Sequence, residues 1–281
     1  MVLKKKKKPE NKKPSSGLVI PGPDDLNEVP EGIHNFLILM YGPKAIGKTT
    51  MASRFPGSVI GMLERGRRGL NIRQLTLKSF EDCLDFRDKC IQDPTVDTLV
   101  FDTIDVLYEQ CLLAECRSRG INHPGEMKDF GATWAVIKDA FRDFFDPIRE
   151  SGKGCLCLSH EKKDTVEPRS GEPYDRLKPS CSNGAYAIVE EAFDFILYYG
   201  KHGKERAISV RPFDEATMEV DCCVGPEGVF LDPNGEPLSI FTVPNDPDAA
   251  FATLISAYEN EVWDAIRGKP KKKKASSEDD E

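Results

Sequence analysis

The stretch Phe36-Leu-Ile-Leu-Met-Tyr-Gly42-Pro-Lys-Ala-Ile-Gly47-Lys48-Thr49-Thr50 decides the fold class of this 281-residue chain. It opens with an uninterrupted apolar run, which is typical of a strand buried on both faces of a sheet. The residues that follow match the pattern G-x-x-x-x-G-K-[ST] in full. Glycines let a backbone wrap closely around phosphate groups, so the loop is predicted to bind a nucleotide.

Each part of this loop has a predicted task. Lys48 is expected to neutralise the β- and γ-phosphates of ATP, and the Thr49 hydroxyl is expected to ligate Mg²⁺. ATP and Mg²⁺ are therefore the predicted ligands. The predicted nucleotide-binding residues are Gly42, Pro43, Lys44, Ala45, Ile46, Gly47, Lys48, Thr49, Thr50 and Asp102.

Outward from the loop, short apolar runs alternate with helical segments, and this alternation predicts an α/β fold with a central, mainly parallel sheet flanked by helices. The expected strands are 36–41, 58–63, 98–102, 154–159, 193–199 and 206–211, with further strands between 218 and 243. The expected helices are 79–92, one through 106–113, 132–149, one beginning near 183, and 248–266. A hairpin turn at 201–204 makes the late strands antiparallel. Segments 121–130 and 161–181 are expected to be loops, the second long and mobile.

Three polar residues stand at the ends of predicted strands and are candidates for catalysis. Asp102 ends the third strand, where a carboxylate would hold the Mg²⁺ shell through water; the alternative is a helix cap. Glu64 follows the second strand, which is expected to neighbour the loop strand and bring this carboxylate to the γ-phosphate, where it could polarise water; otherwise it is a surface residue. His160 ends the fourth strand and could hydrogen-bond the γ-phosphate, or be an ordinary strand-end histidine. The predicted catalytic residues are Lys48, Glu64 and His160.

Composition excludes several classes of protein. The nine cysteines are an odd number and follow no paired spacing, so a disulfide framework or a structural zinc site is not expected, and the thiols should pack as small hydrophobes. No apolar stretch approaches the roughly 20 residues needed to span a bilayer, and the N-terminus lacks the apolar centre of a signal peptide. We therefore expect no membrane partner and a cytoplasmic location, in a bacterial host if the chain is encoded by a phage.

Charge is distributed unevenly along the chain. The formal net charge is −8, yet lysine runs occupy both ends, so the central part is more acidic than this total. An acidic body is a poor general binder of polyanions. We predict a disordered basic arm (1–30), an ATPase core (31–245), a C-terminal helix (246–267) and a disordered charged tail (268–281). The lysine runs could be solubilising tails, targeting signals or nucleic-acid tethers.

Together these motifs resemble the RecA core, and more closely the phage-encoded RecA-like P-loop nucleotide-binding proteins associated with single-strand annealing recombination. The resemblance rests on 42–50, Leu63-Glu64, Val100-Phe-Asp102-Thr103 and Leu158-Ser-His160. It implies a RecA-like ATPase with Glu64 as catalytic base and His160 as a sensor of the γ-phosphate. It also implies a homo-oligomer that acts on single-stranded DNA in phage recombination or replication, with a single-strand-binding protein as a possible partner.

The resemblance places DNA contacts on loops, here 122–130 and 161–180. The second loop carries basic residues and one aromatic, as in single-strand contacts; a solvated lid is the alternative. Its candidates are Lys162, Lys163, Arg169, Tyr174, Arg176 and Lys178. Candidates for an arginine that acts on phosphate within one subunit or across two are Arg65, Arg67, Arg68, Arg206 and Arg211.

Two other functions remain open on the sequence. The first is a nucleotide-gated scaffold that binds ATP, hydrolyses it little and recruits a DNA-processing partner. The second is a kinase or another transferase built on the same loop, which would need an acceptor-binding lid with paired arginines.

Overall fold

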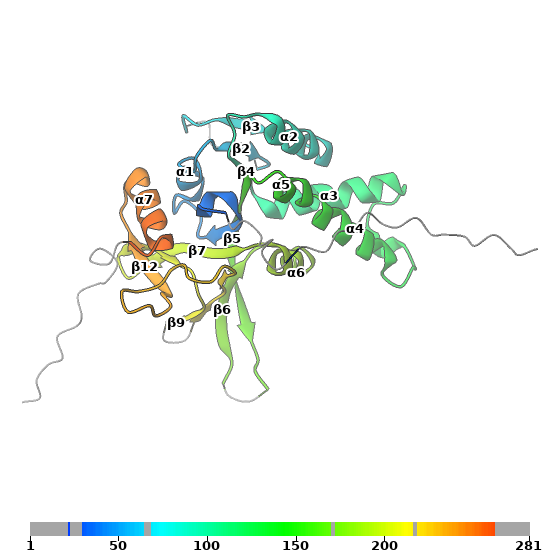
Figure 1. The fold of residues 1–281 in the computed structure, drawn as a ribbon. Helices are drawn as coiled ribbons and strands as arrows, with labels where there is room; N and C mark the ends of the chain where they lie inside the picture. The colour runs from blue at the N-terminus through cyan, green and yellow to red at the C-terminus, as the bar shows by residue number, and fades with distance from the viewer. Residues whose placement is uncertain (1–21, 23–29, 65–68, 170–171, 216–217, 262–281) are drawn as a thin grey trace, which may run out of the picture.

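A computed structural model describes residues 22, 30–64, 69–169, 172–215 and 218–261 of the chain. Its main sheet has the strand order β12-β8-β7-β1-β5-β4-β2-β3 (Figure 1). The strands of this sheet are β1 (Leu37–Gly42), β2 (Val59–Met62), β3 (Gln74–Thr76), β4 (Thr98–Asp102), β5 (Gly154–Val166), β7 (Phe195–His202), β8 (Glu205–Ser209) and β12 (Ile240–Val243). The loop strand β1 is buried along its whole length, as its apolar run predicts.

The six strands from β7 to β3 run parallel, and β8 and β12 close one edge in antiparallel pairs. Four short strands complete the arrangement: β6 (Tyr174–Pro179), β9 (Phe213–Glu215), β10 (Met218–Val220) and β11 (Cys223–Val224). β6 pairs with the extended end of β5 and with β10. The predicted α/β class, with a mainly parallel sheet and late antiparallel strands, is confirmed.

Helices cover both faces of the sheet (Figure 1). They are α1 (Lys48–Ala52), α2 (Phe80–Gln92), α3 (Ile104–Ser118), α4 (Ala132–Asp143), α5 (Asp146–Glu150), α6 (Asn183–Ala192) and α7 (Pro247–Tyr258), with 3₁₀ turns η1 (Ile33–Asn35) and η2 (Pro124–Glu126). Alternate residues of β1 point to opposite faces. Leu37 and Leu39 join a core with α2 to α6, while Ile38 and Met40 join a second core with α1 and α7.

Two predicted helices differ from the structure, and one strand was not predicted. The helix expected over 132–149 is two helices, because Pro147 has no backbone N–H to donate to the preceding turn and lies in the first turn of a new helix, α5. The helix expected to reach 266 ends at Tyr258, and Asn260 follows in the left-handed conformation at φ 61°. Strand β3 was not predicted, because its three residues are exposed and show no apolar pattern.

The prediction of a mobile loop over 161–181 is wrong. Most of this segment is a β-hairpin formed by β5 and β6, which projects from the body (Figure 1). The sequence did not predict these strands because they are polar, and opposite charges on the two strands pair with each other in place of apolar contacts. Lys163 lies 2.7 Å from Asp175, and Lys178 pairs with Asp164. Such cross-strand pairs stabilise a ladder that has little apolar surface to bury.

The predicted arm and tail fall almost wholly outside the described residues. Within the described residues, no helix combines the length and apolarity required to cross a bilayer.

Candidate nucleotide-binding site

The phosphate loop joins β1 to the first turn of α1, and Lys48 lies at its centre. The Lys48 side chain is buried, and its Nζ donates to the carbonyl oxygens of Gly42 at 2.7 Å and Pro43 at 2.9 Å. These hydrogen bonds hold the ammonium group inside the loop. Ile46 is buried against the core on the α1 side, which anchors the loop, whereas Lys44 and Ala45 are exposed.

Two positions in the loop require glycine. Gly42 has φ 154°, and a Cβ there would lie 2.0 Å from the carbonyl oxygen of Tyr199 on β7. Gly47 has φ 113°, a conformation that residues with a side chain rarely adopt. Gly42 is required because β7 fills the space beside it, and Gly47 is required by its backbone conformation.

The Thr49 hydroxyl and the Asp102 carboxylate meet below the loop, where Thr49 Oγ1 donates to Asp102 Oδ2 at 2.8 Å. Asp102 ends β4 and is largely buried. Burial raises the pKa of its carboxyl group, and the hydrogen bond from Thr49 opposes this rise. These two oxygen-bearing side chains are a donor set that suits Mg²⁺, which binds oxygen ligands and keeps several waters.

Glu64 and His160 lie beside Asp102. The backbone N–H of Leu63 donates to the Asp102 carbonyl at 2.8 Å, which places Glu64 next to this strand end. Glu64 Oε1 lies 3.4 Å from His160 Nε2 and accepts a hydrogen bond from Thr103 Oγ1 at 3.3 Å. His160 is in register with Gly42 on the adjacent strand β1. The three predicted strand-end residues thus face the same end of the loop.

The prediction that the second strand neighbours the loop strand is wrong. β5 and β4 lie between β1 and β2. Glu64 nevertheless reaches the site, because parallel strands all present their carboxyl ends at one edge of the sheet, and the segment after β2 folds over the end of β4.

A cavity of about 80 Å³ gathers most of the predicted residues. It is lined by Ala45, Gly47, Lys48, Thr49, Thr50, Met62, Glu64, Leu70, Gln74, Asp102 and His160. Gly42, Pro43, Lys44 and Ile46 belong to the loop but do not line this cavity. Leu70 and Gln74 were not predicted, since they come from the polar segment before and within β3 and carry no pattern that marks them.

Asp105 lies in the first turn of α3 and was not among the predicted site residues. Its carboxylate accepts hydrogen bonds from Ser159 Oγ at 2.9 Å and from Ser180 Oγ at 2.6 Å. Ser180 also donates its backbone N–H to the His160 carbonyl at 2.8 Å. Asp105 therefore connects the start of α3, the strand that carries His160, and the base of the hairpin.

The arginine candidates separate clearly. Arg65, Arg67 and Arg68 lie outside the described residues. Arg211 donates to three backbone carbonyls, those of Val229, Phe230 and Leu238, and so has a structural role. Arg206 on β8 points to the phosphate loop, and its Nη1 would lie 3.3 Å from a Cβ at Gly47.

Most of the basic candidates for DNA binding have partners within the hairpin region. Lys163 and Lys178 pair with aspartates, and Arg176 lies 3.6 Å from Asp221. Lys162 donates to the Cys181 carbonyl at 2.6 Å. A hydrogen bond to Glu219 raises the pKa of Tyr174, so this hydroxyl also has a partner.

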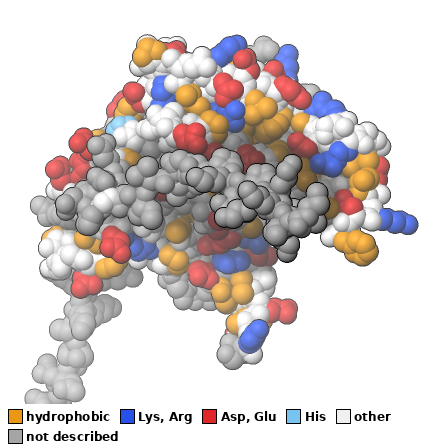
Figure 2. All heavy atoms as spheres, turned by 45° about the vertical axis from the view of Figure 1, so that its right-hand side comes forward, with side chains coloured by type: hydrophobic (Ala, Val, Ile, Leu, Met, Phe, Trp, Pro, Cys, Tyr) orange, Lys and Arg blue, Asp and Glu red, His pale blue; other side chains and the backbone are white. Residues whose placement is uncertain are grey.

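Arg169, the remaining candidate for DNA binding, is exposed near the hairpin end. On the face shown in Figure 2, the described basic side chains are interspersed with acidic ones and do not form a continuous basic surface. Attraction of DNA to this face would therefore depend on local contacts more than on a broad positive field.

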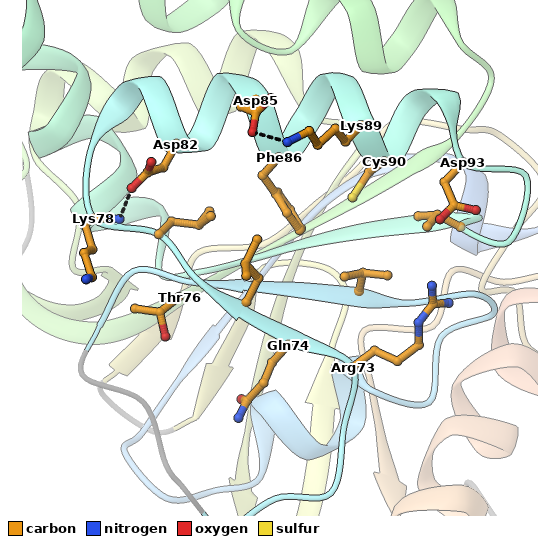
Figure 3. Close-up of a pocket in the computed structure, with 14 residues that line it drawn as sticks. Arg73, Gln74, Thr76, Lys78, Asp82, Asp85, Phe86, Lys89, Cys90 and Asp93 are labelled. Carbon is orange, nitrogen blue, oxygen red and sulfur yellow. Dashed lines mark hydrogen bonds and ion pairs between the residues drawn. The ribbon is translucent and has the colours of Figure 1, made fainter.

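A larger cavity of about 650 Å³ lies between β3 and α2 (Figure 3). Phe86 and Cys90 point from α2 toward β3, while the Gln74 side chain points away from α2. Lys89 pairs with Asp85 on the helix surface at 2.6 Å. This cavity contains none of the strand-end groups described above, so size does not identify the reactive site here.

The residues present fit a nucleotide with Mg²⁺. Lys48 supplies a positive charge within the loop, Thr49 with Asp102 supplies oxygen ligands, and the cavity beside them is lined by loop residues. Fold and site together define a P-loop nucleotide-binding domain.

Comparison with known proteins agrees with this class. The model of the AAA domain family matches residues 34–217, and the chain belongs to this family. It therefore carries a P-loop ATPase domain of the AAA type. No curated protein matches the chain.

Among solved structures, the chain is similar to a KaiC-like protein from the hyperthermophilic archaeon Pyrococcus horikoshii OT3. The sequence identity is 11% and the TM-score is 0.43, with 77% of this chain and 88% of the other covered.

Proposed function

We propose that this protein hydrolyses ATP in a Mg²⁺-dependent reaction. The observation that carries the proposal is the meeting of Glu64, Asp102 and His160 at the carboxyl end of the sheet, beside a complete phosphate loop. A loop alone would bind a nucleotide. A second carboxylate that faces the same space adds a group able to orient and polarise water.

Each residue has a proposed role. Lys48 and the loop N–H groups hold the phosphates, and Thr49 with Asp102 would hold Mg²⁺. The metal ion, when bound, neutralises charge on the phosphate oxygens. Glu64 positions the water for in-line attack on the γ-phosphorus and accepts its proton. His160, on the strand next to the loop strand, donates a hydrogen bond to the γ-phosphate and responds to its loss.

We further propose that the ATPase acts on single-stranded DNA in phage recombination or replication, as a homo-oligomer and with a single-strand-binding protein as a possible partner. The resemblance to the phage RecA-like proteins motivates this step. The structure supports it in one respect: β5 carries His160 and continues directly into the projecting hairpin. A change in the contact between His160 and the γ-phosphate could therefore be transmitted along β5 to the hairpin, which could contact single-stranded DNA.

The test is the steady-state ATPase rate with and without single-stranded DNA. Wild type should hydrolyse ATP in the presence of Mg²⁺. Glu64→Gln should bind ATP but lose hydrolysis by about a hundredfold or more, because the amide cannot accept the proton. DNA should stimulate the wild-type rate, and Arg169→Glu should reduce this stimulation without changing the basal rate.

The outcomes separate the alternatives. Absence of ATP binding by wild type would refute the proposed function. Hydrolysis that DNA does not change would refute the DNA step alone. Binding with negligible hydrolysis, equal in wild type and Glu64→Gln, would favour the nucleotide-gated scaffold.

A further inference from the structure

Arg206 connects the phosphate loop to a cavity outside the site described above. It lies on β8, and its Nη1 is 3.3 Å from the position of a Cβ on Gly47. The Tyr199 hydroxyl, on the neighbouring strand β7, is 3.8 Å from the same position. Both side chains belong to the same chain as the loop, so no second subunit is needed to bring a guanidinium group to it.

The surroundings of this guanidinium group leave its charge available. Arg206 Nη1 makes two long contacts, 3.4 Å to the Tyr199 hydroxyl and 3.5 Å to the Asn245 carbonyl oxygen. No carboxylate of the described residues forms an ion pair with it. The contrast is Arg211, only five residues further on, which donates to three carbonyls. A half-buried guanidinium without an acidic partner is suited to bind a phosphate.

Arg206 also lines a cavity of about 320 Å³ between β8, β12 and α7. Its lining residues are Lys204, Glu205, Arg206, Thr242, Val243, Pro244, Asn245 and Thr253. This volume lies in the range of small-molecule sites, which combine an apolar wall with a few polar groups. Here Val243 and Pro244 provide apolar surface, and Thr242 and Asn245 provide polar groups.

We infer that this cavity receives the ribose and base of the nucleotide, and that Arg206 contacts the phosphate chain where it leaves the loop. The inference rests on the proposed function, since it requires a nucleotide in the loop. Two observations indicate the direction in which the nucleotide extends from the loop. Gly47 lines the phosphate cavity, and Arg206, which reaches Gly47, lines the second cavity. A ligand that extends from the loop past Arg206 enters the space between β12 and α7.

An ion pair connects α7, which contributes Thr253 to the cavity, with the segment that follows α1. Arg54, just after α1, lies 2.7 Å from Asp248 in the first turn of α7. Phe55 also packs against Phe251 of α7, with ring centroids 4.9 Å apart. The helix that contributes Thr253 to the cavity wall is thus connected to the helix that follows the phosphate loop.

Equilibrium binding with three probes tests the inference: ATP, ADP and inorganic tripolyphosphate. Arg206→Ala should weaken all three by about ten- to hundredfold, because it removes a charged contact to phosphate. Arg206→Lys should restore part of the loss. Asn245→Trp and Thr253→Phe, which fill the cavity, should weaken ATP and ADP by about tenfold or more and leave tripolyphosphate binding unchanged.

The controls keep the result interpretable. Arg73→Ala removes an arginine of the β3 side and should change nothing, since Arg73 contacts Thr95. Thermal unfolding of every variant checks that it is folded. Lys48→Ala tests the loop itself: if it binds ATP as wild type does, the proposed function fails. If Lys48→Ala abolishes binding but the two cavity variants bind ATP like wild type, the cavity assignment is wrong. If Arg206→Ala binds tripolyphosphate like wild type, the phosphate contact of Arg206 is wrong.

Discussion

At the scale of single residues, backbone geometry determines what the phosphate loop tolerates. Gly42 ends β1 beside β7, and the space for its missing side chain is filled by a backbone carbonyl of Tyr199. A backbone atom cannot turn aside as a flexible side chain can. The sequence pattern identified this glycine, but glycine is required here because of a strand that is more than 150 residues away in the sequence.

Gly42→Ala is therefore expected to disrupt the site more than an ordinary glycine substitution. The new Cβ must displace β7 or the loop, so the free energy of unfolding should fall by a few kcal/mol, about the cost of an overpacked core. ATP binding should fall with it. Gly152→Ala is the matched control, since Gly152 also has a positive φ, 72°, but has open space around it. Equal losses of unfolding free energy in urea for the two variants would contradict this explanation.

Reactivity of the thiols is a second property set residue by residue. Eight of the nine cysteines are buried, and Cys223 is exposed. Burial raises the pKa of Cys83 to about 12 and that of Cys90 to about 11, so these thiols stay protonated at pH 8. The free-thiol prediction from the sequence is consistent with this arrangement.

We expect one thiol per chain to react with a disulfide reagent such as DTNB at pH 8 in the native state. Burial also raises the pKa of Cys223, so its thiolate fraction is below that of a free cysteine and its rate should still increase above pH 8.5. Cys223→Ser should remove the native reaction. Rapid reaction of several thiols in that variant would show that the core opens readily.

At the scale of elements, helices and buried strands were predicted well where capping residues or apolar runs mark them in the sequence. Ser79 caps α2, accepting a hydrogen bond from the backbone N–H of Asp82 at 3.1 Å, while Asp82 Oδ2 accepts one from the backbone N–H of Lys78 at 2.8 Å. The Ser79 hydrogen bond is an N-terminal cap, while the Asp82 side chain bonds the backbone N–H of the residue before the cap instead of that of Ser79 itself. The hairpin of β5 and β6 was missed because its stabilising partners are charged pairs across two strands, which no periodicity reveals.

Ser79→Ala should lower the free energy of unfolding by about 1 kcal/mol, the usual cost of removing an N-terminal cap. Denaturation in urea measures it. Ser118→Ala is a suitable control: Ser118 ends α3 and only donates back to the Glu115 carbonyl within its own helix, so a smaller effect is expected. A loss for Ser118→Ala as large as for Ser79→Ala would show that capping is not the cause.

At the scale of the whole molecule, the sheet divides the interior into two cores, and the phosphate loop is held between them. Ile46 and Met51 belong to the core on the α7 side, whereas Phe101, next to Asp102, belongs to the core under α2 and α3. A ligand that bridges the loop and Asp102 therefore connects segments that are held by both cores.

ATP with Mg²⁺ should for this reason raise the stability of the whole fold. At a free ligand concentration a hundredfold above Kd, the gain is about 2.7 kcal/mol, which differential scanning calorimetry records as a higher midpoint of unfolding. Lys48→Ala should show no such shift, because the ammonium group that holds the phosphates is missing. A shift of the same size in both proteins would place the ligand elsewhere.

The sequence by itself determined the phosphate loop, the strands around it and the identity of the residues at their ends, because glycine spacing and apolar runs are local properties of the chain. Only the tertiary structure decided which of these ends meet. Strand order placed β5 and β4 between β1 and β2, brought Glu64 to His160 and Thr103, and turned Arg206 of β8 toward Gly47. Strand order depends on the packing of distant segments against one another, so no local pattern could reveal these contacts.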